Sequence, residues 1–497
     1  MLLMPPSLGE WLPEDHLVWT VLGAVEQMDL ARFSEAYRLG AAGRAPYDPA
    51  MMVALLLYAY ARGIRSSRGI ERACWEDVAF KVITGMRTPD HSTIAEFRCR
   101  HEIEIAELFD DVLGLCREAG LVSVGVITID GTKIKANASM DQNRSYRELA
   151  IEILREADEI DRQEDELYGD ARGDELPEQL RTPEGRRQAL ADAKRRIQER
   201  KRREISEAND GGEVEVDPAR SFRRKGGRRE WLRLARRDLE AHRERQAAPI
   251  PRDRDARLFD AARRLEQNQR IELAANDQYE AWRLTARDPL GRRMLKPTKP
   301  YQPTVLPDGV INLSDPDSRV MRTQGTPPRQ AYNAQAAVND RQVILAAEIS
   351  IDAPDFGHLA PMLDTTLNGL RAQGVHETPE VVLADAGYWH TAQMQHIAQQ
   401  GIEVLAPPDG NMREGKRPGW NRAVYEQMRH KLNTDRGRKL YAQRKITIEP
   451  VFGQIKYNRR IDRFMRRGRA AARSEWRLAA ATHNLLKLHS HWIANPA

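Results

Sequence analysis

The sequence predicts a mixed α/β protein with an all-helical N-terminal part and a mainly helical insertion. In residues 301–490, apolar strand-like runs alternate with amphipathic helical segments, the pattern typical of α/β folds. Residues 1–120 contain several short helical patterns, and residues 141–300 are dense in charges of both signs. We therefore expect a helical domain over 1–120, a core split between 121–140 and 301–490, and a charged insertion over 141–300.

The N-terminal part carries recognisable helix signals. Asp48 is the expected N-cap of a helix that Pro49 opens and Gly63 ends, and Thr93 and Glu96 have the spacing of a capping box. Several short helices of this kind can build a helix-turn-helix-type DNA reader or a plain helical bundle. The pattern favours the bundle and leaves the DNA reader open.

The insertion is expected to contain long exposed helices. Its segment RRQALADAKRRIQERKRREISEA carries both charge signs throughout, which favours a solvated helical arm over a packed core. The alternative is an arm that contacts DNA or another subunit.

The composition argues against secreted and membrane classes. The three cysteines, Cys74, Cys99 and Cys116, form no Cys-x-x-Cys pair, so we expect free thiols in a reducing cytoplasm. The N-terminus lacks the basic and apolar regions of a signal peptide, and the longest apolar run, residues 51–61, is too short to span a bilayer. We therefore expect a cytoplasmic protein without membrane contact.

A basic block lies near the C-terminus. The formal net charge is only +5, but residues 413–477 contain 20 Lys and Arg against 6 Asp and Glu. Such a concentrated excess of positive charge favours binding to a polyanion. A solvated helical face is the alternative and the usual role of charge runs. We favour the polyanion because the block surrounds a candidate catalytic carboxylate.

A carboxylate follows directly on an expected core strand. The run from Val124 to Ile129 predicts a short buried strand, and Asp130 and Gly131 come next. Asp-Gly is a common turn dipeptide, so a turn is one interpretation. A metal ligand held on a rigid strand is the other, and it requires carboxylate partners elsewhere in the chain.

Two further carboxylates are candidate partners. Asp385 follows the apolar strand of PEVVLADAGY, and we expect it to meet Asp130 because ligands collect at the carboxyl ends of strands in α/β sheets. Glu449 is expected near a helix start, with Thr447 as N-cap and Pro450 in the first turn. Three converging carboxylates suit Mg²⁺, and two such ions can activate a water or a 3′-hydroxyl at a phosphodiester. The alternative for Glu449 is a simple ion pair with nearby cations.

Smaller candidates follow from position alone. Asp352 and Asp355 lie near another expected helix start and are predicted to be caps rather than ligands. Lys133 and Asn137 follow Asp130 and are weaker candidates for contact with a scissile phosphate.

These segments resemble a known family. Five blocks are similar, in order, to the signature blocks of bacterial insertion-sequence DDE transposases: ITIDGTKIKANAS, NLSDPDSRVM, YNAQAAVND, LADAGY and RKITIEPVFGQIK. Two N-terminal segments resemble the helical domain that precedes the core in one branch of that family: YDPAMMVALLLYAYARGIRSSRGIERAC and PDHSTIAEFR. The resemblance covers about residues 45–135 and 310–490.

The resemblance implies a ribonuclease-H-like mixed sheet with flanking helices and a metal-binding triad of Asp130, Asp385 and Glu449. It also implies cleavage at the ends of the element and strand transfer into target DNA, with two Mg²⁺ ions for which Mn²⁺ can substitute. A nucleoid-associated homodimer on double-stranded DNA is expected, because pairing two element ends needs two active sites. The residues expected to bind DNA near the cut are Tyr441, Arg444, Lys445, Lys456, Arg459 and Arg460.

The match leaves some roles open. The family's third block often has three residues between its Arg and its Glu, whereas four separate Arg444 from Glu449, so Arg444 or Lys445 takes the basic role. Two alternative functions also remain: a ribonuclease-H-like nuclease that cuts without joining, and a non-enzymatic DNA-binding repressor derived from a transposase.

Overall fold

The computed structural model describes residues 7–35, 46–156, 227–246, 249–287, 290–292, 301, 304, 306–323, 325–408 and 422–495. Contacts divide the chain into two compact units. Unit 1 consists of Met1–Met140 and Asp317–Ala497, and unit 2 is Asp141–Pro316. The N-terminal helices and the core thus fall in one unit, and the insertion forms the other.

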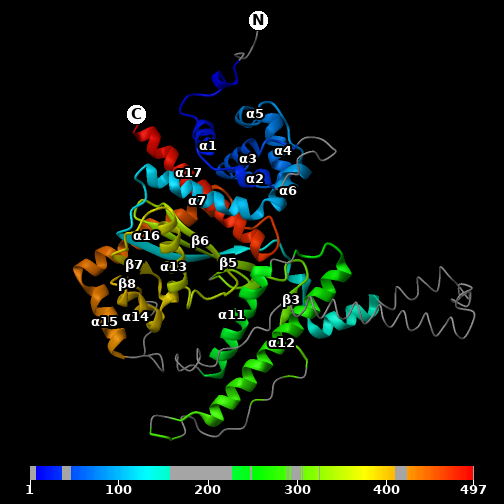
Figure 1. Cartoon of the computed structure of the whole chain (residues 1–497), viewed down its shortest axis with the longest axis vertical. Coiled ribbons are helices and arrows are strands. Elements are labelled where there is room, and N and C mark those ends of the chain that lie inside the picture. The colour runs from blue at the N-terminus through cyan, green and yellow to red at the C-terminus, as the bar shows by residue number, and fades with distance from the viewer. Residues whose placement is uncertain are drawn as a thin grey trace, which may run out of the picture. The chain divides into compact units, whose positions relative to one another are not determined.

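Unit 1 contains a six-stranded mixed sheet (Figure 1). Its strands are β1 (Val126–Lys135), β4 (Arg319–Met321), β5 (Arg329–Asn339), β6 (Ile344–Ser350), β7 (Val381–Ala384) and β8 (Glu403–Leu405). Central β1 pairs antiparallel with β5 on one side and parallel with β7 on the other. β8 continues the sheet in parallel beyond β7, and β4 and β6 pair antiparallel with β5. This arrangement confirms the predicted fold class.

The strand sequences explain these positions. Ile127 and Ile129 of β1 and all four residues of β7 are buried, as expected for strands covered on both faces. β5 is alanine-rich and buried over nearly its whole length, which allows neighbouring helices to approach the sheet closely.

Short helices make up the N-terminal part of unit 1. They are η1 (Leu8–Glu10), α1 (Leu17–Glu26), α2 (Ala31–Glu35), α3 (Pro49–Ala61), α4 (Ser67–Glu76), α5 (Val78–Thr84), α6 (His91–Arg100) and α7 (Glu102–Glu118). Asp48 caps α3 as predicted, because its side chain accepts from the Ala50 amide. The capping box at Thr93 and Glu96 is wrong: Asp90 is the N-cap of α6, and its carboxylate accepts from the Thr93 amide at 2.8 Å.

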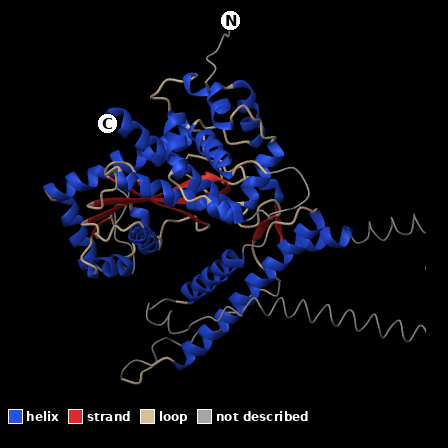
Figure 2. Ribbon diagram, turned by 45° about the horizontal axis from the view of Figure 1, so that its top comes forward, coloured by secondary structure: helices blue, strands red, loops and turns tan. Residues whose placement is uncertain are grey.

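Further helices follow the sheet strands, and one of them, α17, also packs against the N-terminal helices. They are α13 (Leu359–Ala372), η4 (Ala386–Tyr388), α14 (Thr391–Gln399), α15 (Arg422–Asn433), α16 (Asp435–Gly453), the π-helical turn η5 (Gln454–Asn458) and α17 (Arg469–Ala494). α17 packs against β6, α3 and α7, and it runs beside α7 (Figure 1). Figure 2 shows helices on both faces of the sheet. The N-terminal helices therefore join the core through α17.

Unit 2 is mainly helical, as predicted. It contains η2 (Met140–Gln142) at its boundary, a helical segment over 146–156, α11 (Arg228–Gln246), α12 (Arg254–Thr285) and a small antiparallel pair of β2 (Asn143–Ser145) and β3 (Val310–Asn312). Trp231 of α11 packs against Tyr279 and Trp282 of α12 with ring centroids 5.7 Å apart in each pair. The predicted arm RRQALADAKRRIQERKRREISEA lies outside the described residues.

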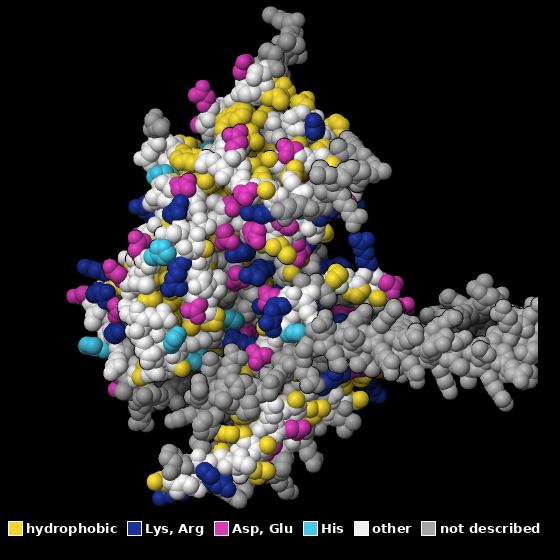
Figure 3. Space-filling model, in the orientation of Figure 1, with side chains coloured by type: hydrophobic (Ala, Val, Ile, Leu, Met, Phe, Trp, Pro, Cys, Tyr) yellow, Lys and Arg dark blue, Asp and Glu magenta, His cyan; other side chains and the backbone are white. Residues whose placement is uncertain are grey.

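The surface and the thiols agree with the composition. Cys74, Cys99 and Cys116 are free, as predicted. Within the described ranges, the helices lack any apolar stretch long enough to cross a bilayer. On the face of unit 1 shown in Figure 3, Lys and Arg side chains are interspersed with Asp and Glu. The positive charge is therefore not gathered into one patch on that face.

Candidate active site

Parallel pairing of β1 and β7 brings two aspartates together. Ile129 and Ala384 are register partners, and the next residues along the two strands are Asp130 and Asp385. The two carboxylates thus lie on neighbouring strands, as the sequence led us to expect. β7 ends at Ala384, but β1 continues through Asp130 to Lys135, so the predicted end of the strand at Asp130 and the alternative of a turn there are both wrong.

Both carboxyl groups are sheltered from water. The Asp130 side chain is 14% exposed. Burial, together with the negative charge of Asp385, raises the pKa of Asp130 to about 7. Burial and then the charge of Asp355 raise the pKa of Asp385, while the Arg444 guanidinium opposes both shifts. Buried acids that repel one another are destabilised until a cation compensates their charge.

Arg444 of α16 lies between the first aspartate and the third predicted carboxylate. Its Nη1 donates to Asp130 Oδ2 at 2.7 Å, and its Nη2 lies 3.9 Å from Glu449 Oε1. The Glu449 side chain is 54% exposed, so it remains accessible from solvent. Lys445 is exposed. Arg444, rather than Lys445, is therefore the basic residue at the acids.

The predicted helix start beside Glu449 is wrong. α16 begins at Asp435 with Thr434 as its N-cap, and Thr447 and Pro450 lie inside it. Proline has no amide hydrogen and cannot donate to the carbonyl four residues earlier, which belongs to Ile446. Gln342 Nε2 donates to this carbonyl at 2.8 Å instead. A long-range side-chain contact thus satisfies the group that Pro450 leaves unpaired.

Lys456 lies against β1 close to Asp130. It belongs to the π-helical turn η5, and its Nζ lies 2.9 Å from Thr132 Oγ1 and 3.4 Å from the Lys133 carbonyl. Burial lowers the pKa of Lys456. π-Helical turns are frequent at functional sites. Here the turn places the Lys456 ammonium group beside Thr132, which follows Asp130 by two residues on β1.

Two other predicted DNA contacts lie near this region. Tyr441 is partly buried, and burial raises the pKa of its phenol. Arg460 is exposed, and its carbonyl accepts from Arg65 Nη2 at 2.6 Å. Both side chains belong to the segment that carries Arg444 and Lys456.

Arg459 has different surroundings. Its side chain is buried, and its Nη1 donates to the Ala479 carbonyl at 3.1 Å and to Thr482 Oγ1 at 2.8 Å. Burial lowers the pKa of this guanidinium to about 10. A side chain that binds the interior face of α17 cannot reach a phosphate. The prediction that Arg459 contacts DNA is therefore at odds with its position.

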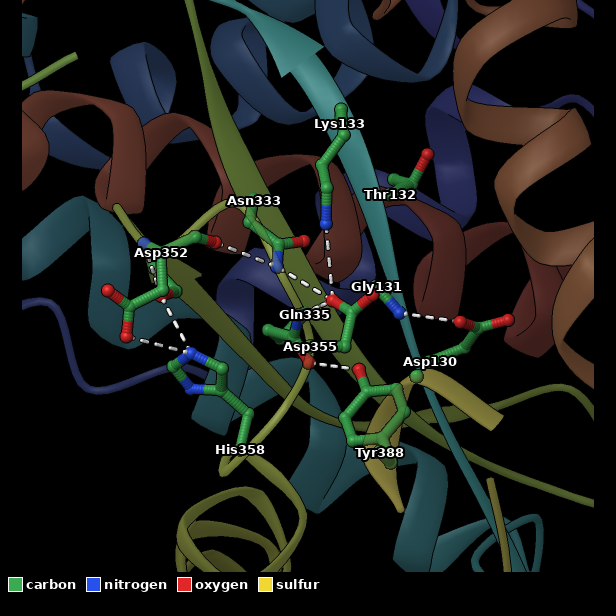
Figure 4. Close-up of polar contacts among 12 residues, drawn as sticks. Asp130, Gly131, Thr132, Lys133, Asn333, Gln335, Asp352, Asp355, His358 and Tyr388 are labelled. Atoms are coloured by element: carbon green, nitrogen blue, oxygen red, sulfur yellow. Dashed lines mark hydrogen bonds and ion pairs between the residues drawn. The ribbon is translucent and has the colours of Figure 1, made fainter. Parts of the chain in front are cut away.

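A fourth carboxylate, that of Asp355, lies near Asp130 (Figure 4). Asp355 Oδ1 accepts from Asn333 Nδ2 at 2.7 Å and from Gln335 Nε2 at 2.8 Å, and it lies 3.2 Å from Lys133 Nζ. The predicted capping role of Asp355 is wrong, because His358 is the N-cap of α13. Two amide side chains within the otherwise apolar YNAQAAV of β5 were the sequence signal for a buried polar partner.

The donor set suits a hard divalent cation. Carboxylate oxygens are the ligands that Mg²⁺ prefers, and the Arg444 guanidinium already acts as a counter-cation between Asp130 and Glu449. Among the described residues, no three acidic, His or Cys side chains converge closely enough to hold a metal ion. Glu449 does not join Asp130 in such a group, because the Arg444 guanidinium lies between the two carboxylates.

Comparisons with known proteins identify two regions of the chain. Residues 310–485 match the family described as Transposase DDE domain, and residues 6–100 match Transposase domain (DUF772). No curated protein and no solved structure shows significant similarity to the chain.

The two matches take in most of unit 1. The DDE match contains Asp385, Arg444 and Glu449, and Asp130 lies between the two matched regions. Enzymes with this domain bind DNA, cleave and transfer its strands, and generally use divalent metal ions. The chain is therefore a transposase, with an N-terminal transposase domain followed by a transposase DDE domain.

Proposed function

We propose that the protein cleaves the ends of its own insertion sequence and joins them to target DNA by phosphodiester hydrolysis and transesterification. The observation that supports this most directly is the β1–β7 register, which sets Asp130 beside Asp385. Arg444 of α16 contacts Asp130 and approaches Glu449, so these two carboxylates share one basic neighbour.

Asp130, Asp385 and Glu449 would hold two Mg²⁺ ions, with Mn²⁺ as a substitute. Such ions activate a water or a 3′-hydroxyl and stabilise the oxygen that leaves phosphorus. Asp130 and Asp385 are fixed by strands, whereas Glu449 is exposed on a helix. Rigid strands favour accurate placement of the first two groups.

Basic side chains next to the acids bind and orient DNA. Arg444 neutralises Asp130 in the free protein, and Lys456 is positioned by Thr132 close to Asp130. Lys445 and Arg460 are exposed on the same segment and contact phosphates by charge. Tyr441 supports Arg444 from its partly buried place.

The remaining parts serve recognition and pairing of ends. The N-terminal helices recognise the terminal inverted repeats, and two copies of the chain act together on double-stranded DNA. A homodimer supplies one active site for each element end. No covalent protein–DNA intermediate is required, because water and the 3′-hydroxyl are the nucleophiles.

The test is a cleavage and joining assay on duplexes that carry the inverted repeats flanking the gene. Wild type is compared with Asp385→Asn and with Asp435→Asn, a matched control on α16 whose side chain is 88% exposed. With Mg²⁺, we expect cleaved and joined products from wild type and control. Asp385→Asn is expected to bind the duplex and form neither product.

Other outcomes select the alternatives. Equal activity in Asp385→Asn would exclude the triad. Cleavage without joined products would favour a nuclease. If all three proteins bound the duplex and none of them cleaved it, a DNA-binding repressor would be favoured.

A further inference from the structure

We propose that Asp355 is a fourth acidic residue of the active site, a positioning residue whose fixed negative charge strengthens divalent-cation binding at Asp130 and Asp385. The inference rests on the proposed function, because it requires a cation at those two carboxylates. It extends that function by assigning a role to the loop before α13.

Asp355 occupies the space beside two glycines, one next to each aspartate. A Cβ at Gly131 would lie 2.6 Å from Asp355 Oδ1, and a Cβ at Gly387 would lie 3.5 Å from Asp355 Oδ2. Gly131 directly follows Asp130, and Gly387 comes two residues after Asp385. The same point at Gly387 lies 3.0 Å from Asp385 Oδ1. Asp355 and Asp385 therefore flank Gly387, and a Cβ at Gly131 would clash with the Asp355 carboxylate.

One oxygen of Asp355 is held in place and the other is left available. Oδ1 accepts from Asn333 and Gln335 and pairs with Lys133, and Gln335 Oε1 accepts in turn from the Tyr388 hydroxyl (Figure 4). Among the described residues, no side chain donates to Oδ2. The contacts to Oδ1 orient the carboxylate so that Oδ2 lies on the side of Gly387 and Asp385.

Asn333 provides an independent sign of a ligand. It is fully buried, and its Nδ2 donates to Asp355 Oδ1 and to the Asp352 carbonyl, but its Oδ1 has no hydrogen-bond partner among the residues that the structure describes. This oxygen lies 2.8 Å from the Cβ position at Gly131, the point that Asp355 Oδ1 also approaches. Buried acceptors without donors are rare. Water bound to a nearby cation would satisfy this acceptor.

The charges around Asp130 and Asp385 also favour binding of a cation. Asp355 repels Asp130 and Asp385, and its charge contributes to the raised pKa of both carboxyl groups. Lys133 compensates Asp355, and Arg444 compensates Asp130. Asp385 has neither partner, since no described Lys or Arg forms an ion pair with it. A divalent cation beside Asp385 would gain from the field of Asp355.

The test measures Mn²⁺ binding to the full chain without DNA, by electron paramagnetic resonance. Asp355→Asn is expected to weaken binding roughly tenfold, the effect of removing one nearby charge from a divalent ion in a partly hydrated site. Asp352→Asn is the matched control, because this carboxylate lies three residues away and pairs with His358 at 3.2 Å. The control is expected to bind Mn²⁺ as wild type does.

A second variant, with the opposite expected effect on Mn²⁺ binding, shows whether Asp355 acts through its charge or through packing. Lys133→Met removes the cation that compensates Asp355, so Mn²⁺ binding is expected to tighten. If Asp355 served packing alone, both variants would weaken binding or leave it unchanged, and the proposal would fail. Lys133→Met also carries the test if thermal unfolding shows that Asp355→Asn does not fold.

The variant Asp385→Asn separates a failure of the proposed triad from a failure of the proposed role of Asp355. Weaker Mn²⁺ binding in Asp385→Asn with unchanged binding in Asp355→Asn would overturn the role of Asp355 and keep the triad. Unchanged binding in Asp385→Asn, or no Mn²⁺ binding by wild type, would overturn the triad and the role of Asp355 together.

Discussion

At the residue scale, Asp130 shows how the protein maintains an acid in an unfavourable place. Its carboxyl is buried beside Asp385, and only the Arg444 ion pair and the Gly131 amide favour its charged form. The resulting pKa of about 7 lies well above the ordinary value of 3.8. The folded protein therefore retains the Asp130 proton at pH values where the unfolded chain has lost it.

This difference predicts a pH-dependent effect of Asp130→Asn. In wild type, the stability contributed by Asp130 is fully present below about pH 4 and is lost as pH rises through about 7. Asparagine is neutral throughout, and the effect of the Arg444 ion pair is already contained in the wild-type pKa of about 7. Without metal, we expect the variant to gain roughly 1–3 kcal/mol relative to wild type between pH 5 and pH 8.

Thermal unfolding in EDTA at the two pH values measures this gain. Asp435→Asn should show no such change, because its carboxylate is 88% exposed. A constant difference between wild type and Asp130→Asn at both pH values would contradict the raised pKa.

At the element scale, the loop after α3 fixes the segment that follows η5. Arg65 donates from Nη2 to the Arg460 carbonyl and from Nη1 to the Arg463 carbonyl, and Gly63 packs directly against the Arg459 backbone. This segment continues the basic region that carries Lys456. Its position therefore depends on helices of the N-terminal transposase domain.

Gly63→Ala tests this close packing. Gly63 has φ +74°, and a Cβ there would lie 2.9 Å from the Arg459 carbonyl oxygen, so both backbone strain and a clash are expected. Gly85 is a matched control, because its φ is +57° and no atom lies within 4 Å of its added Cβ. We expect Gly85→Ala to cost about 1 kcal/mol of unfolding free energy and Gly63→Ala clearly more.

Unfolding curves of the two variants give the comparison. Equal losses in Gly63→Ala and Gly85→Ala would mean that the contact with Arg459 yields easily, and that the loop does not fix the segment after η5.

At the scale of the whole molecule, the insertion interrupts unit 1, and its described residues contribute no strand to the six-stranded sheet. All six strands of that sheet belong to unit 1. The two ends of the interruption are held by one segment, since Arg467 Nε donates to the Asn137 carbonyl at 3.0 Å and the Arg469 amide donates to Asp317 Oδ2 at 3.0 Å. Contacts within unit 1 thus hold the two chain ends between which the insertion lies.

Replacing residues 141–316 with a Gly/Ser linker of about ten residues should leave unit 1 folded. We expect a cooperative thermal transition and Mn²⁺ affinity close to that of the full chain. The cleavage and joining assay on the same protein then reports whether unit 2 is needed on DNA. An insoluble product, or one without a cooperative transition, would show that unit 1 depends on the insertion.

The sequence by itself determined the fold class and the two aspartates of neighbouring strands. Strands and helices follow from local periodicity, and Asp130 and Asp385 each follow an apolar run that predicts a buried strand. Their meeting required one further rule, that carboxyl ends of parallel strands share an edge of the sheet. Both steps use information that lies within a few residues of each aspartate. The structure showed that the strand at Asp130 continues to Lys135.

Only the tertiary structure decided the roles of the surrounding side chains. Arg444 and Lys445 are equivalent in sequence, but only Arg444 reaches Asp130. Asp355 has the sequence context of a cap, but Asn333 of β5 and Lys133 of β1 hold its carboxylate. Arg459 belongs to a basic run but is buried under α17. Burial and ion pairing depend on residues far away in the chain, which no local pattern contains.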